Sequence, residues 1–160
     1  MKQLKLESEI KIADHVGELN EQDSQLLAAA KEAAKGAYAP YSHFKVGAAV
    51  LLQNGVTVIG SNQENAAYPV TICGERNAIF SASAQYPDTP ILAVAITIIS
   101  KNKDISRPVP PCGSCRQVIY ETEARHQQDV RIILQGDTGE IYLINSVKDI
   151  FPLLFDSSYL

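Results

Sequence analysis

Three cysteines and one glutamate are the residues of this chain whose types and spacing could bind a metal and move a proton. They lie in two segments, TICGERNA at 71–78 and PPCGSCRQ at 110–117. Cys112 and Cys115 are three positions apart, so on a first helical turn their sulfurs share a face. Cys73 stands where the other helix is expected to begin, and helix N-termini favour thiolates. Three thiolates with no obvious fourth protein ligand predict a catalytic zinc site that leaves one position for water.

Glu75 follows Cys73 by two residues and could stand beside that water without binding the metal. Zinc lowers the pKa of a bound water toward about 7, and a neighbouring carboxylate can accept its proton. Cys73 alone would be read as an inert buried thiol, but Glu75 and the Cys-x-x-Cys pair together favour a ligand. A structural zinc site would need a fourth Cys or His. The three histidines lie in sequence surroundings that do not suggest a metal ligand: His15, His43 and His126.

The predicted elements place both segments at helix starts. Helices are expected from the N-cap Asn20 to Gly36, over 74–85, and from near Cys112 through 116–124. Strands are expected over the stretches 46–52, 56–60, 92–100, 130–135 and 140–144, the first two joined by an Asn54-Gly55 turn. A strand within 4–12 and a short helix in the tail, broken at Pro152, are also possible. The alternation predicts an α/β fold, a three-layer α/β/α arrangement around a five-stranded mixed sheet.

Length and charge limit the remaining possibilities. The 160 residues, 46% of them hydrophobic, suit one domain. We expect residues 1–19 to form an N-terminal extension and residues 20–160 a single catalytic domain. The formal net charge of −4 argues against a nucleic-acid partner. The sequence predicts no signal peptide and no membrane partner, because no apolar run approaches the length of a membrane span. We therefore expect a reducing, cytoplasmic setting, in which an odd number of cysteines fits metal binding or catalysis better than a disulfide framework.

Several motifs together resemble one known family, the small zinc-dependent cytidine deaminases whose first ligand is Cys. The matching segments are YSHFKVGA (41–48), NQENAAY (62–68), CGERNA (73–78), PCGSCRQ (111–117) and FPLLF (151–155). They occur in the family's order and span about residues 38 to 155. The resemblance implies the cytidine deaminase fold and a homotetramer with shared active sites.

The resemblance also implies roles for the central residues. Cys73, Cys112 and Cys115 would hold one zinc ion per chain, and Glu75 would be the catalytic proton shuttle. A zinc-bound hydroxide would attack C4 of the pyrimidine while Glu75 delivers a proton to N3, and ammonia would leave. Arg76 would offset the charge of the thiolates.

The substrate-binding residues likewise come from the resemblance. Asn62 and Glu64 would hydrogen-bond the ribose, with the 3′-hydroxyl as the expected partner, and Phe44 would pack beside the nucleoside. The backbone N–H of Gly74 would recognise the base. Phe155 would stack on a base in a neighbouring subunit. From the residues alone, Asn62 and Glu64 could equally cap a turn after the hairpin.

The leading prediction is hydrolytic deamination of cytidine and deoxycytidine to uridine and deoxyuridine, a step of pyrimidine salvage. Gly74 stands where the family usually has Ala, so extra room for the substrate keeps a second possibility open. This is a related zinc deaminase acting on another aminated heterocycle, such as a blasticidin-type antibiotic, a modified pyrimidine nucleoside or a purine. A third is a zinc-binding module without catalysis, which leaves Glu75 unexplained.

Overall fold

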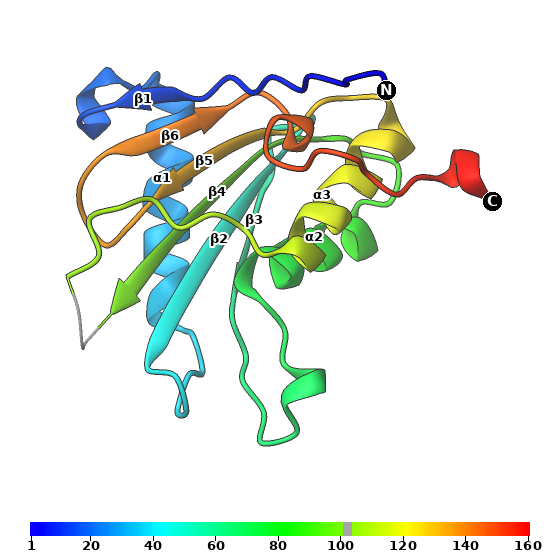
Figure 1. The fold of residues 1–160 in the computed structure, drawn as a ribbon. Helices are drawn as coiled ribbons and strands as arrows, with labels where there is room; N and C mark the ends of the chain where they lie inside the picture. Colours follow the sequence, from blue (N-terminus) through cyan, green and yellow to red (C-terminus); the bar gives the residue numbers. More distant parts are fainter. Residues whose placement is uncertain (101–103) are drawn as a thin grey trace.

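The computed structural model describes residues 1–100 and 104–160 and shows one six-stranded mixed sheet covered by helices on both faces (Figure 1). The strand order is β1-β6-β5-β4-β2-β3, in which only β4 and β5 run parallel. The helices are α1 (Glu21–Lys35), α2 (Gly74–Gln85) and α3 (Gly113–His126); the strands are β1 (Lys11–Ala13), β2 (Phe44–Leu52), β3 (Thr57–Ser61), β4 (Ile91–Ser100), β5 (Arg131–Gln135) and β6 (Ile141–Ile144). The predicted α/β fold class is confirmed.

Helix α1 covers one face of the sheet, behind β2 and β4 in Figure 1. Asn20 is its N-cap, as predicted, because the Asn20 side chain accepts a hydrogen bond of 2.8 Å from the Asp23 amide. Gly47 of β2 lies directly beneath this helix, where a Cβ atom would come within 2.0 Å of the Ala30 carbonyl oxygen. The absence of a side chain at Gly47 is therefore what lets α1 rest on the sheet.

Helices α2 and α3 lie side by side on the opposite face (Figure 1). Successive side chains of β2 and β4 point to opposite faces of the sheet, so they are shared between the two layers. Ala49 and Ala95 face α1, whereas Val50 and Val94 belong to the core under α2 and α3. The sheet is thus buried on both sides, and the loops that precede α2 and α3 are free to carry the site.

The sheet has six strands where five were predicted, because residues 11–13 add β1. Lys11–Ala13 pairs antiparallel with β6, opposite Ile141–Leu143. Ala13 is buried in the α1 layer, whereas Ile12, on the other side of the strand, is exposed. The short strand covers the edge of β6 and leaves its own outer edge open.

The short helix expected in the tail is present only as a 3₁₀ helix at Val147–Asp149, which ends before Pro152. Irregular backbone around Pro152 follows, and then a second 3₁₀ helix at Ser157–Tyr159. In the part of the chain that the structure describes, none of the helices is long and apolar enough to cross a lipid bilayer.

The close approach of α1 to β2 predicts that Gly47→Ala destabilises the protein. The added methyl would overlap backbone of α1, which has to move, so the free energy of unfolding should fall by about 1–3 kcal/mol. Urea-induced unfolding measures this change. Gly36→Ala is the matched control, because a Cβ there would lie at an ordinary 3.5 Å from Ala33. Equal stability of the Gly47 and Gly36 variants would contradict the packing argument.

Candidate functional site

The first turns of α2 and α3 bring the three cysteines together. Cys73 is the N-cap of α2 and Cys112 is the N-cap of α3, and both have extended backbone angles. Cys115 lies in the first turn of α3 and is fully buried, whereas Cys112 is exposed. The three sulfurs all lie within 4.8 Å of one another, and those of Cys112 and Cys115 are 3.4 Å apart. The spacing that the sequence suggested is thus present in the fold.

These sulfurs are suited to a divalent metal of the zinc class. Zinc bonds to sulfur at about 2.3 Å, which separates two sulfurs of a tetrahedral site by about 3.8 Å. The observed cluster is close to this spacing without rearrangement of the backbone. Cys73 and Cys112 also stand at helix N-termini, where the helix dipole favours the ionised form of a thiol. Cys73, Cys112 and Cys115 are therefore the residues that could hold the metal.

The electrostatics of the cluster differ from thiol to thiol. The pKa of Cys73 is lowered to about 5, because Cys115 donates a hydrogen bond to its sulfur and the Arg76 guanidinium lies beside it. The pKa of Cys115 is raised, because it is the donor in that hydrogen bond and is buried. The thiolate form is thus favoured at Cys73 and disfavoured at Cys115.

Arg76 extends from the first turn of α2 toward the sulfur of Cys73. Its Nη2 atom is 3.5 Å from that sulfur and 3.4 Å from the Thr71 carbonyl oxygen. Its buried Nε atom has no hydrogen-bond partner among residues 1–100 and 104–160. The positive charge of Arg76 therefore lies against the sulfur of Cys73. A thiolate there offsets the unfavourable placement of a cation at a helix N-terminus.

Glu75 is buried on the same turn, with 4% of its surface exposed. Burial raises the pKa of its carboxyl group, while hydrogen bonds from its own backbone amide and from Cys115 act in the opposite direction. The carboxyl group thus lies beside the sulfur cluster in a setting that makes it easier to protonate than a surface glutamate. A carboxyl group of this kind can take up and release protons next to a metal.

Asn62 and Glu64 hold the backbone of residues 41–46. The Asn62 side chain accepts a hydrogen bond of 2.7 Å from the Val46 amide and donates one of 3.0 Å to the Phe44 carbonyl oxygen. Glu64 accepts hydrogen bonds from the Tyr41 amide and from the Ser42 amide and hydroxyl group. Both residues therefore fix the segment that carries Phe44, which lies at the start of β2 and not in a turn after the hairpin.

These hydrogen bonds lower the pKa of Glu64. Burial acts to raise it, but the Ser42 hydroxyl group and the amides of Tyr41 and Ser42 outweigh burial. The Glu64 carboxylate also borders a cavity of about 340 Å³, lined as well by Tyr41, Ser42, Tyr68 and Thr71. A charged acceptor is thus available at the wall of an open cavity.

Gly74 and Phe155 lie in different surroundings. A Cβ atom on Gly74 would be 3.0 Å from the Val46 carbonyl oxygen and 3.3 Å from the Asn62 amide nitrogen. The side of Gly74 that lacks a methyl group therefore faces the backbone of β2 and of the loop after β3. Phe155 is exposed in the tail, and its ring stacks on Tyr159 at a centroid distance of 5.7 Å.

Sequence reasoning gave no role to Ser42, Arg116 or Gln117. Ser42 holds Glu64, whereas Arg116 and Gln117 donate hydrogen bonds to tail carbonyl oxygens. Ser42 lies in the segment YSHFKVGA, and Arg116 and Gln117 lie in the segment PCGSCRQ. Their partners include backbone atoms distant in the sequence, and no residue pattern marks a carbonyl oxygen as an acceptor.

Comparisons with known proteins agree with this geometry. A sequence model described as the cytidine and deoxycytidylate deaminase zinc-binding region matches residues 20–128. A cytidine deaminase from Halalkalibacterium halodurans is 42% identical over 130 residues, which cover 81% of this chain and 91% of that protein.

Solved structures give the same result. A cytidine deaminase from Burkholderia pseudomallei superposes with a TM-score of 0.72 at 36% identity, over 86% of this chain and all of the other. One from Mycobacterium tuberculosis has a TM-score of 0.64 at 31% identity, over 82% and 95% of the two chains. With the family model matched over more than half of its length, this chain belongs to the cytidine and deoxycytidylate deaminase family.

Proposed function

We propose that this chain is an enzyme that hydrolytically deaminates cytidine and deoxycytidine, giving uridine or deoxyuridine and ammonia in pyrimidine salvage. The observation that carries the proposal is the meeting of three cysteine sulfurs with the buried carboxyl group of Glu75 at two helix N-termini. Relatives named cytidine deaminase, matched over most of their length, support cytidine as the substrate. A module that only binds zinc would have no use for a buried carboxyl group beside the metal ligands.

Cys73, Cys112 and Cys115 would hold one zinc ion per chain. The bound ion supplies a Lewis acid that makes water nucleophilic near neutral pH. Arg76 keeps a positive charge against the sulfur of Cys73. Glu75 accepts the proton of the attacking water and delivers it to N3 of the pyrimidine as the C4–O bond forms. Glu75 then takes the remaining proton from the hydroxyl group now bonded to C4 and passes it to the amino group, so that ammonia leaves as the C4–N bond breaks and the C4=O bond forms.

Asn62 and Glu64 keep hydrogen-bonding capacity for a ribose hydroxyl group. The Asn62 amide group has a second N–H beyond the one donated to Phe44, and the Glu64 carboxylate has lone pairs beyond those used by Tyr41 and Ser42. Their structural role and their proposed contact with the 3′-hydroxyl group are therefore compatible. Phe44 would pack beside the nucleoside, held in place by the same two residues.

The packing of Gly74 favours an ordinary pyrimidine nucleoside over a larger aminated heterocycle. The space that a methyl group would occupy is bordered by Val46 and Asn62 backbone at 3.0–3.3 Å. The missing methyl group therefore does not add a pocket for a substituent on the base. The backbone N–H of Gly74 would still recognise the base.

We also propose that residues 20–160 form the catalytic domain, that residues 1–19 are an extension, and that the enzyme is a homotetramer with shared active sites. The family match begins at residue 20. Large apolar side chains are exposed on the elements that surround the sulfur cluster, and a neighbouring subunit would cover them: Tyr41, Tyr68, Val70, Phe80 and Phe155. Phe155 would stack on the base bound by that neighbour. Thiol ligands must stay reduced, which fits the cytoplasm.

Cys112→Ala should release the metal. Cys112 is exposed, so its removal costs little packing, and the expected loss of zinc follows from the loss of one ligand. Zinc content per chain and the midpoint of thermal unfolding should both fall. Ser114→Ala, an exposed change in the same turn, is the control and should keep about one zinc per chain. Full zinc content in the Cys112 variant would remove this residue from the ligand set.

Glu75→Gln should abolish most turnover while leaving zinc bound. Glutamine fills the same volume but cannot accept a proton, so kcat for cytidine should fall by at least about 10²-fold. Ultraviolet-monitored turnover and zinc analysis of the same sample measure the two effects. Glu121→Gln on the exposed side of α3 is the control. Loss of zinc, or turnover near that of the control, would mean that Glu75 is not the proton carrier.

The proposed contact of Glu64 with the ribose is tested by combining a variant with a modified substrate. Glu64→Gln and 3′-deoxycytidine should each lower kcat/KM by about tenfold or more, since each removes a charge-assisted hydrogen bond. If both remove the same bond, their combination should lose little beyond the larger single effect. If Glu64→Gln acts only by disturbing the 41–44 turn, the two losses in kcat/KM should multiply, and that outcome would refute the contact. Deoxycytidine, which keeps its 3′-hydroxyl group, is the control substrate.

A further inference from the structure

We propose that Arg116 and Gln117 are positioning residues that fasten tail residues 150–155 to the start of α3, next to the metal-binding turn. This anchoring sets the position from which Phe155 acts on substrate. The role of Phe155 rests on the proposed function, whereas the anchoring itself is seen in the hydrogen bonds of the tail.

Arg116 joins two segments that flank the site. Its Nε atom donates a hydrogen bond of 2.8 Å to the Pro111 carbonyl oxygen, and its Nη1 atom donates one of 2.6 Å to the Ile150 carbonyl oxygen. Pro111 directly precedes Cys112, and Ile150 begins the tail segment. One planar guanidinium group therefore ties the loop before a proposed zinc ligand to the tail, a geometry that a lysine ammonium group does not reproduce.

Gln117 holds the other end of the same segment. Its Nε2 atom donates a hydrogen bond of 2.9 Å to the Phe155 carbonyl oxygen. Arg116 and Gln117 are consecutive and come directly after Cys115. The two anchors thus enclose tail residues 151–154 and tie them to the turn that carries the Cys115 sulfur.

The backbone between the anchors shows that they impose the conformation of the tail. Leu153 has a φ of 57°, in the left-handed region that residues other than glycine rarely adopt. Its side chain is 81% exposed, so its own packing does not compensate for the strain. Strained residues persist where their surroundings hold them, and the hydrogen bonds at Ile150 and Phe155 are such surroundings.

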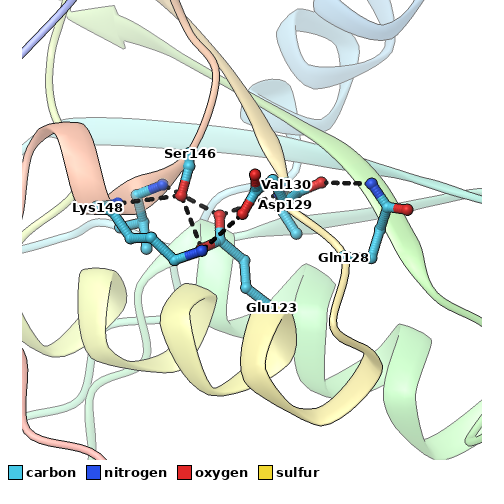
Figure 2. Close-up of polar contacts among 7 residues, drawn as sticks. Glu123, Gln128, Asp129, Val130, Ser146 and Lys148 are labelled. Atoms are coloured by element: carbon cyan, nitrogen blue, oxygen red, sulfur yellow. Dashed lines mark hydrogen bonds and ion pairs between the residues drawn. The ribbon is translucent and has the colours of Figure 1, made fainter.

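The start of the tail is held separately, further along α3 (Figure 2). The buried Glu123 carboxylate accepts hydrogen bonds from the Val147 amide at 3.1 Å and from the Ser146 hydroxyl group at 2.9 Å. Glu123 also accepts one from the Val130 amide at 3.0 Å, at the entrance to β5. Residues 146–147 therefore stay in place when Arg116 or Gln117 is changed, and such changes should release residues 150–155 alone.

Limited proteolysis measures this release without relying on turnover. Chymotrypsin can cut after Leu153 and after Phe155, whereas Pro152 protects the bond after Phe151. Gln117→Leu and Arg116→Lys should each raise the rate of cutting, followed by mass spectrometry, by about fivefold, as expected for the loss of one ordinary hydrogen bond. The matched controls are Gln25→Leu on α1 and Arg125→Lys at the end of α3, which should be cut at the wild-type rate.

Kinetics then distinguish positioning from a purely structural role. For Gln117→Leu we expect KM for cytidine to rise about fivefold with kcat within about twofold of wild type and unchanged zinc content. Cutting at the control rate, or faster cutting with unchanged KM, would overturn the proposal. Faster cutting in a protein whose wild type does not deaminate cytidine would support the anchoring and count against the proposed function alone.

Discussion

The convergence of two helix N-termini is the constraint on which the rest of this structure depends. The three sulfurs lie within 4.8 Å of one another only because α2 and α3 run side by side on one face of the sheet. Cysteine is a poor N-cap, and neither Cys73 nor Cys112 makes a side-chain capping hydrogen bond. Losing a cap costs a helix roughly 0.5–2 kcal/mol. Both helices thus give up local stability at the positions where a bound cation would restore it.

The helices are positioned by close contact between their backbones and glycines of the sheet, as well as by side-chain packing. Gly60 of β3 lies beneath α2, where a Cβ atom would come within 2.4 Å of the Ala78 amide nitrogen. Gly47 does the same for α1 on the other face. Because β2 and β3 are paired, the two close approaches fix the heights of two helices relative to one sheet. The position of Cys73 follows from that height.

The sequence was sufficient for the main elements and for the sulfur cluster. The helix after Asn20, the Asn54-Gly55 hairpin and the helix over 74–85 follow from local capping, turn and periodicity rules, and each appears in the structure. Local sequence does not specify the sixth strand, because a three-residue strand is stabilised by pairing with β6 and not by its own composition. The hydrogen bonds from Asn62 and Arg116 to distant backbone atoms could not be predicted either, because they depend on which segments the fold brings together.

The charges around the cluster explain why an arginine and a glutamate follow the first cysteine. A divalent cation held by three thiolates carries a net charge of −1, and Arg76, placed against Cys73, brings the group to neutrality. A negative charge on the buried Glu75 is unfavourable, because burial raises the pKa of this carboxyl group. Adding a proton to Glu75 removes that charge, and releasing the proton restores it. The Cys-x-Glu-Arg segment thus combines the proposed metal ligand, the proposed proton carrier and a fixed positive charge in one helical turn.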